Sequence, residues 1–143
     1  MFGRERSILV HVTTESPLVV MFEDDPLLRV MYRRLFERHL GCRVEEANDG
    51  ASGLALVRER RPHLVVLDVN LPDMSGVEVL ETIRNEPAIA DTPCVAITGE
   101  NQRLVIEQLV SGRVLDILLK PMVLTRDLPR LERVLMKALP TAV

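Results

Sequence analysis

The chain lacks the features that mark several classes of protein. It has no tryptophan, and aromatic residues make up only 3% of its 143 positions, so a surface that stacks nucleic acid bases is not expected. The net charge is −3, which gives no general affinity for nucleic acid. No apolar run is long enough to cross a membrane, and the first residues do not form a convincing signal peptide. We therefore expect a cytoplasmic protein that binds neither nucleic acid nor membranes.

Cysteine and lysine are both scarce, with two residues of each. Cys42 and Cys94 are too few for a disulfide framework and too far apart for a zinc pair, so we interpret them as reduced, partly buried thiols. Sixteen arginines carry the rest of the positive charge. Lys120 ends an apolar run in this arginine-rich chain, which indicates a need for its compact ammonium group.

Apolar runs alternate with helical patterns along the chain. The predicted strands are 17–22, 43–47, 64–68, 94–98 and 114–119. The predicted helices run from 26 to 40, from the cap Asp49 to 60, from the cap Ser75 to 85, from 101 to 111, and from the cap Asp127 to 139. This alternation predicts an α/β fold, a doubly wound parallel sheet of five strands in the order 2-1-3-4-5.

Four of the predicted strands are followed or ended by polar side chains. Glu23 and Asp24 follow the first strand, Asp68 ends the third, Thr98 the fourth and Lys120 the fifth. Because the carboxyl ends of parallel strands share one edge, we expect these groups to converge. Clustered carboxylates repel one another unless a cation lies between them, and oxygen ligands suit Mg²⁺. An aspartate beside Mg²⁺ can attack phosphorus, while an ammonium and a hydroxyl hold phosphoryl oxygens. The sequence therefore predicts a phosphoacceptor site.

Taken in order, these residues resemble the receiver domain of response regulators in bacterial two-component signalling systems. The matching segments are VVMFEDDP, NDG, LDVNLPDMSG, AITG and LKP. No single segment is specific, but their order is. We expect a receiver domain at 17–139, of the flavodoxin-like (βα)5 fold, with an N-terminal extension at 1–16 and a tail at 140–143. Apolar residues in 7–14 suggest that this segment packs along a sheet edge or against a neighbouring molecule, and a plain linker is the alternative.

The resemblance implies which residues accept the phosphoryl group and hold the metal. Asp68 corresponds to the aspartate that becomes phosphorylated. Glu23 and Asp24 correspond to the acidic pair that holds Mg²⁺ together with Asp68, and Asn70 adds its backbone carbonyl. Glu23 stands where the family more often has aspartate, a change that the family tolerates.

The resemblance also implies a set of switch residues. Thr98, followed by Gly99, corresponds to the hydroxyl that moves toward the phosphoryl group, and Lys120 to the lysine that pairs with it. The bond between Lys120 and Pro121 is expected to be cis. Ile117 occupies the switch position where the family usually has an aromatic residue that moves together with the threonine, so we expect a weakened coupling to output.

A histidine kinase or a histidine phosphotransfer protein would supply the phosphoryl group. The output partner is unknown, and a homodimer through the fourth helix, fifth strand and fifth helix is one candidate. We do not expect a turnover enzyme. One alternative is an adaptor that works without phosphorylation, which Ile117 favours. A second is an aspartate-nucleophile phosphohydrolase, but such enzymes usually place an acid two residues after the nucleophile, where this chain has Asn70.

The remaining charged residues near the site have simpler interpretations. Asp25 is interpreted as a helix cap, because the metal needs only two of the three consecutive acids. Asp73 is interpreted as a solvated loop residue. Arg29, Arg33 and Arg34 are interpreted as a solvated helix face, with a docking surface for the phosphodonor as the alternative.

Overall fold

The computed structural model describes residues 16–99 and 101–140. The strands are β1 (Leu18–Phe22), β2 (Arg43–Ala47), β3 (Leu64–Leu67), β4 (Cys94–Thr98) and β5 (Ile117–Leu119). The helices are α2 (Pro26–Arg34), a π-helical continuation η1 (Leu35–His39), α3 (Gly50–Arg60), α4 (Gly76–Asn85), α5 (Arg103–Ser111) and α6 (Leu124–Ala138). Across the described ranges, no helix has the length and apolar character to cross a membrane. The predicted packing of segment 7–14 falls outside these ranges.

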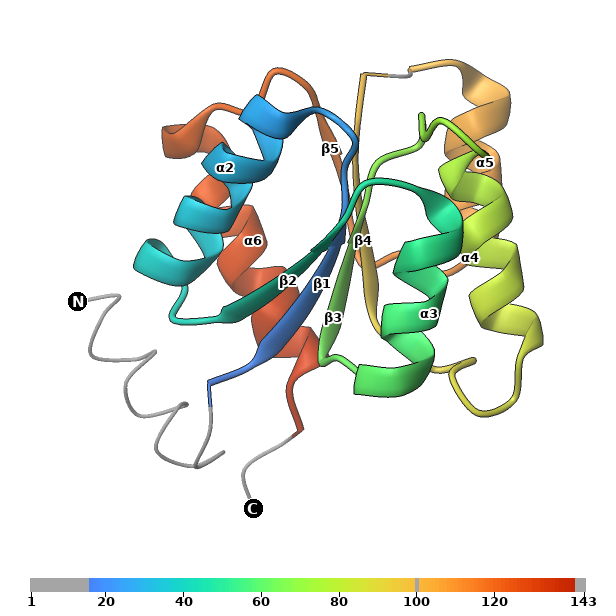
Figure 1. The fold of residues 1–143 in the computed structure, drawn as a ribbon. Coiled ribbons are helices and arrows are strands. Elements are labelled where there is room, and N and C mark those ends of the chain that lie inside the picture. Colours follow the sequence, from blue (N-terminus) through green and yellow to red (C-terminus); the bar gives the residue numbers. More distant parts are fainter. Residues whose placement is uncertain (1–15, 100, 141–143) are drawn as a thin grey trace.

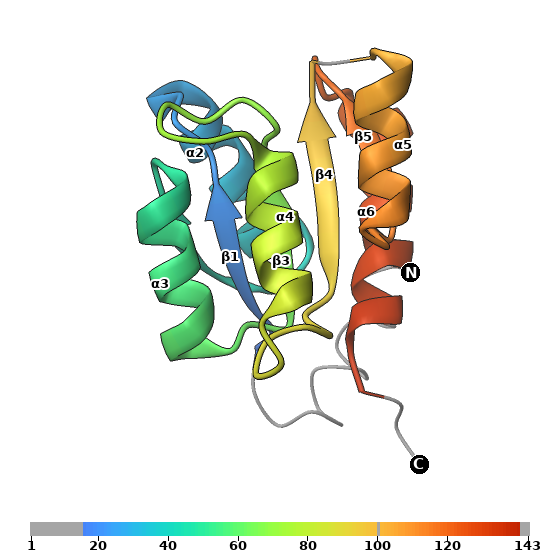
Figure 2. The same cartoon turned by 90° about the vertical axis from the view of Figure 1, so that its right-hand side faces the viewer.

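The five strands form one parallel sheet in the order β2-β1-β3-β4-β5, which confirms the predicted topology. Helices α2 and α6 cover one face, and α3, α4 and α5 cover the other (Figure 1). Figure 2 shows β1 and β4 pointing to the same end of the molecule. The strand order reverses between β1 and β3, so the loops after these two strands leave the sheet side by side.

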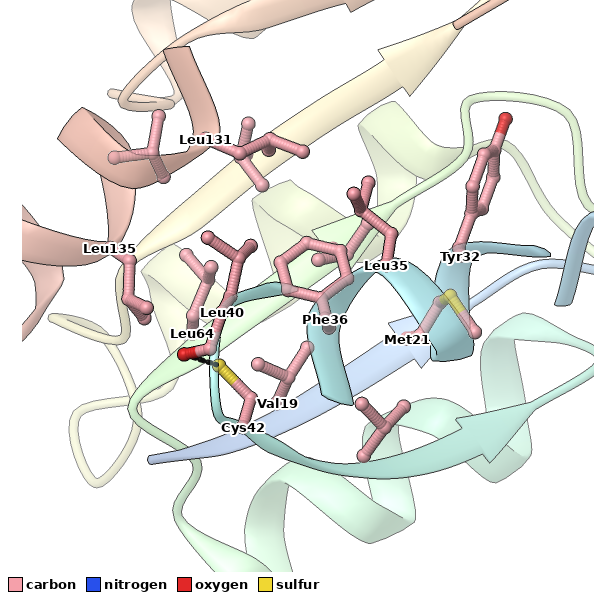
Figure 3. Packing of buried hydrophobic residues seen from close by; sticks show 14 of the residues in the cluster. Val19, Met21, Tyr32, Leu35, Phe36, Leu40, Cys42, Leu64, Leu131 and Leu135 are labelled. Atoms are coloured by element: carbon pink, nitrogen blue, oxygen red, sulfur yellow. Dashed lines mark hydrogen bonds between the residues drawn. The ribbon is translucent and has the colours of Figure 1, made fainter. Parts of the chain in front are cut away.

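Residues along the central strands β1, β3 and β4 alternate between two hydrophobic cores, one on each face of the sheet. In β1, Val19 and Met21 pack with α2 and α6, whereas Val20 and Phe22 pack with the other three helices. All four side chains are buried. Figure 3 shows the first core, where side chains of α2, η1 and α6 meet those of β1 and β3. Because helices cover both faces of the sheet, successive residues of these strands are all buried. This explains why their sequences are continuous apolar runs.

The helix after β1 begins where the sequence predicts but changes its winding. Asp25 caps it, because its carboxylate accepts a hydrogen bond from the Leu27 amide at 2.9 Å. The last turn is π-helical, which the residue pattern does not predict. Gly41 then takes a left-handed conformation, with φ of 67°, and ends the segment.

The start of the last helix corrects one prediction. The helix α6 begins at Leu124 with Val123 as its cap, so Asp127 is not the residue that precedes the helix. Instead Asp127 is fully buried in the first turn, where its carboxylate accepts a hydrogen bond from the Val123 amide at 2.8 Å. Arg126 pairs with the same carboxylate at 2.9 Å. Asp127 therefore provides a hydrogen-bond acceptor for a backbone amide at the helix start, but it does so from within the helix and not from the position before it.

Candidate functional site

The candidate site lies at the carboxyl edge of the sheet, where the loops after β1 and β3 meet. Phe22 pairs in register with Leu67, so the residues that follow them, Glu23 and Asp68, are neighbours. Asp24 comes next in the β1–α2 loop. Glu23, Asp24 and Asp68 each offer a carboxylate oxygen, and these oxygens lie within 4.8 Å of one another. The structure thus brings together the three acids that the sequence singles out.

Lys120 reaches the same site from the end of β5. Its Nζ donates to Glu23 Oε1 at 3.0 Å and to Asp68 Oδ2 at 3.1 Å. Its backbone amide donates to the Thr98 carbonyl at 2.9 Å, which fixes the end of β5 against β4. The bond between Lys120 and Pro121 is cis, as the resemblance implies.

The charges at the site are not balanced. Three carboxylates face a single ammonium group. Burial raises the pKa of Glu23 above its usual value, despite the hydrogen bond from Lys120, and the charge of Asp68 raises it further. Burial lowers the pKa of Lys120, but its hydrogen bond to Glu23 and the charge of Asp68 outweigh burial and raise it. The excess negative charge and the oxygen ligands suit a divalent cation such as Mg²⁺.

The loop after β3 is folded tightly around Asp68. The Asn70 amide donates to Asp68 Oδ1 at 3.2 Å, and Asn70 forms an antiparallel bridge with Ser75. The Gly76 amide donates to the Val69 carbonyl at 2.6 Å. A Cβ on Gly76 would collide with the Asp68 carbonyl and would lie 2.8 Å from Val69 Cα, so only glycine lets α4 begin this close to Asp68.

Asp73 has a role in this loop that sequence reasoning missed. Its carboxylate accepts hydrogen bonds from the amides of Gly50 at 2.7 Å and Ala51 at 2.9 Å, at the start of α3. These two hydrogen bonds hold the pKa of Asp73 below its usual value. Asp73 is therefore exposed but not merely solvated, because it ties the loop after Asp68 to the start of a neighbouring helix.

Arg29 corrects the prediction of a solvated helix face. Its Nη1 donates to the carbonyls of Glu23 at 2.9 Å and Asp24 at 3.0 Å, so it holds the backbone of the acidic loop. Arg33, one turn later, instead pairs with Glu46 of β2 at 2.7 Å. Arginines at this spacing are compatible with an amphipathic helix, and the sequence gives no signal for contacts with backbone carbonyls.

The predicted switch residues lie along β4 and β5. Thr98 is fully buried at the end of β4, next to Gly99, which is exposed and has room for a side chain because a Cβ there would meet no atom within 4 Å. Ile117 is half-buried and packs into the core beneath α5. Its carbonyl accepts a hydrogen bond from Arg130 of α6 at 3.1 Å. The predicted switch position thus holds a half-buried aliphatic side chain that packs against the core.

Comparisons with known proteins agree with this geometry. Residues 19–131 match the family model of the response regulator receiver domain. The chain is 38% identical over 106 residues to the transcriptional regulatory protein AfsQ1 of Streptomyces coelicolor, which covers 73% of this chain and 45% of that protein. It is 37% identical over 95 residues to the probable transcriptional regulatory protein TcrX of Mycobacterium tuberculosis. This match covers 66% of this chain and 38% of TcrX. The chain thus spans less than half the length of these relatives.

Among solved structures, the chain is similar to the chemotaxis response regulator CheY4 of Vibrio cholerae. The TM-score is 0.75 at 27% sequence identity, and the match covers 83% of this chain and 98% of that one. The similarity therefore extends over most of the chain rather than over the site alone.

Proposed function

The chain belongs to the receiver domain family of response regulators, and from this premise we propose that Asp68 accepts a phosphoryl group in a Mg²⁺-dependent reaction. The observation that carries the proposal is the meeting of three carboxylates and one lysine at the edge of the sheet. Phosphorylation would make the domain a signalling switch. We propose that this domain extends over 17–139.

The metal would be held by the carboxylates of Glu23, Asp24 and Asp68 and by the backbone carbonyl of Asn70. When bound, Mg²⁺ would supply positive charge to offset the charge of the acids and of the phosphoryl oxygens. The chain would supply only a few ligands, all of them oxygen atoms. This fits Mg²⁺, which usually keeps several of its water ligands when it binds a protein.

The phosphodonor would be a phosphohistidine of a histidine kinase or a histidine phosphotransfer protein. A carboxylate oxygen of Asp68 attacks phosphorus and forms an O–P bond, the P–N bond to the donor imidazole breaks, and the imidazole takes up a proton. Lys120 shifts its pairing from the bare carboxylate to the phosphoryl oxygens, and the Thr98 hydroxyl donates to another oxygen. The chain modifies itself and releases no product of its own, so it is not a turnover enzyme.

The alternative of an adaptor that ignores phosphorylation has one observation in its favour, the aliphatic Ile117 at the switch position. The acidic set and Lys120 are nevertheless complete and in contact, which an adaptor would not require. For output we propose the face formed by α5, β5 and α6, through which a homodimer or another partner would bind.

The proposal is tested by incubating the chain with Mg²⁺ and acetyl phosphate and measuring the intact mass. A single phosphoryl adduct is expected, and it should disappear in Asp68→Asn and when the metal is chelated. Asp91→Asn is the matched control, because it removes an exposed carboxylate from the connector before β4. An adduct that survives in Asp68→Asn, or its absence from the unmodified chain, would contradict the proposal.

A further inference from the structure

Arg29 lies in the early part of α2, and its side chain folds back toward the acidic loop. One guanidinium nitrogen, Nη1, donates to the carbonyls of both Glu23 and Asp24, at 2.9 and 3.0 Å. The side chain is only 20% exposed, so it is packed against the loop rather than extended into solvent. A planar guanidinium in this position restrains the two consecutive peptide groups that carry the acids.

A second contact holds the guanidinium from the side of the sheet. Glu46 of β2 lies with Oε1 3.9 Å from Arg29 Nε, and its other oxygen pairs with Arg33 at 2.7 Å. Glu46 is in register with Met21, the last but one residue of β1 before the loop begins. The arginine thus connects α2, the β1–α2 loop and β2, three elements that meet beneath the acids.

Asp24 needs such support more than Glu23 does. The Glu23 carboxylate accepts hydrogen bonds from Lys120 and from the Asp25 amide. The Asp24 side chain is exposed, and among the residues at 16–99 and 101–140 none donates a hydrogen bond to its carboxylate. The direction of this carboxylate is therefore set through its own peptide group, which Arg29 holds.

We propose that Arg29 is a positioning residue that sets the affinity of the acidic site for a divalent cation by fixing the peptide groups of Glu23 and Asp24. The inference rests on the proposed function, because it takes the acids as metal ligands. Partners behind metal ligands commonly matter for affinity even though they do not touch the metal.

The sign of the effect separates positioning from simple charge. A guanidinium near the site repels a divalent cation, so if charge alone mattered, removal of Arg29 would tighten binding. If Arg29 instead orients the acids, its removal weakens binding despite the lost repulsion. The two explanations thus predict opposite changes in the same dissociation constant.

The test is a titration of the whole chain with Mg²⁺, followed by the amide resonances of the β1–α2 loop. Arg29→Met is expected to weaken Mg²⁺ binding on the order of tenfold. Arg29→Lys keeps the charge but replaces the planar guanidinium. Its dissociation constant for Mg²⁺ should lie between those of the unmodified chain and of Arg29→Met. Arg33→Met is the matched control, because it removes the same charge from the same helix and from the same Glu46 partner. Its dissociation constant should stay within about twofold of the unmodified chain.

Unfolding in urea without metal is measured on the same variants, so that lost stability is not mistaken for lost affinity. Unchanged or tighter Mg²⁺ binding in Arg29→Met would overturn the inference, whatever its stability. Equal weakening in Arg33→Met would also overturn it, because the effect would then follow from Glu46, the partner that both arginines share, rather than from the carbonyl contacts of Arg29. If the unmodified chain binds no Mg²⁺ at these acids, the proposed function fails as well.

Discussion

Gly76 controls how closely α4 approaches the loop after Asp68, and it is the first of several single residues that shape the candidate site. A Cβ at this position would meet the Asp68 carbonyl and the Val69 Cα, both backbone atoms. Backbone in a loop this tightly bonded has little freedom to move aside. A side chain here would therefore displace Asp68 or the start of α4.

We expect Gly76→Ala to lower the free energy of unfolding by more than about 2 kcal/mol, in the range of an overpacked core position. The change is measured by urea denaturation. Gly99→Ala is the control, because nothing lies within 4 Å of a Cβ there, and it should stay within about 0.5 kcal/mol. Small losses in both variants would show that the loop after β3 yields easily.

Asp24 adds a third negative charge to two carboxylates that already share one ammonium. Asp24→Asn should therefore raise metal-free stability by about 0.5 kcal/mol, a modest value because the side chain is exposed. It should also abolish the response to Mg²⁺. In the unmodified chain, Mg²⁺ at ten times its dissociation constant should add about 1.4 kcal/mol.

Thermal unfolding with and without Mg²⁺ measures both effects. Asp25→Asn is the neighbouring control, because it makes the same charge change at a residue that caps α2, and asparagine also caps helices. It should keep the response to Mg²⁺. An undiminished response in Asp24→Asn would remove Asp24 from the metal site.

At the scale of elements, Asp73 joins the loop after β3 to the start of α3. Its pKa is depressed in the folded state below the ordinary value of 3.8. The hydrogen bonds of the ionised carboxylate therefore stabilise the fold at a pH above this value. Their contribution is lost as the pH falls below 3.8 toward the lower folded-state pKa.

Asp73→Asn should thus unfold at a lower urea concentration than the unmodified chain at about pH 7, and the difference should shrink below about pH 4. Asp91→Asn, on an exposed connector, should show no such pH-dependent difference. A gap between Asp73→Asn and the unmodified chain that stays constant from neutral to acid pH would mean that the ionised carboxylate is not what matters.

The elements show what the residue pattern can and cannot predict. The apolar runs and the local caps are readable, since Asp49 and Ser75 cap α3 and α4 through amides three residues ahead. Contacts such as those of Arg29 and Asp73 are made with backbone carbonyls and amides, which every residue carries. No residue pattern signals them, because, unlike a helix cap, these side chains have no fixed spacing along the chain from the backbone groups that they contact.

The candidate site follows the same division. Glu23, Asp68 and Lys120 could be predicted to meet, because each sits at the end of a strand in a sheet whose order follows from the alternation of elements. How the loops between them are held could not, since it depends on side chains that reach across the fold. The helix start at Leu124 was missed for a similar reason, because Asp127 acts from within the helix.

At the scale of the whole molecule, the proposed function requires a signal at Asp68 to reach the proposed output face, formed by α5, β5 and α6. The position between them is Ile117, which is half-buried in the core beneath α5. Isoleucine is branched at Cβ and has no large ring to bury or expose, so it offers few alternative packings. The link between the site and this face is therefore expected to be weak.

We expect a phosphoryl mimic to change dimerisation or partner binding through this face by only about 1–2 kcal/mol. Ile117→Tyr should enlarge the response if the core accepts the ring. The measurement is a dimerisation or binding titration with and without beryllium fluoride, and Ile117→Val is the conservative control. A shift of several hundredfold in the unmodified chain would contradict the expectation.

The short edge strand β5 has a consequence for how the molecule opens. It has three residues and ends at Leu119, which is 44% exposed, and among the strands of residues 16–99 and 101–140 it pairs only with β4, whereas β1 is buried and paired on both sides. Amide hydrogens of β5 should therefore exchange with deuterium through local opening, well before those of β1, which require global unfolding. Lys120 follows β5 directly, so the ammonium group is carried by a strand that is expected to open before the centre of the sheet. The acids, in contrast, follow β1 and β3, the strands that detach last.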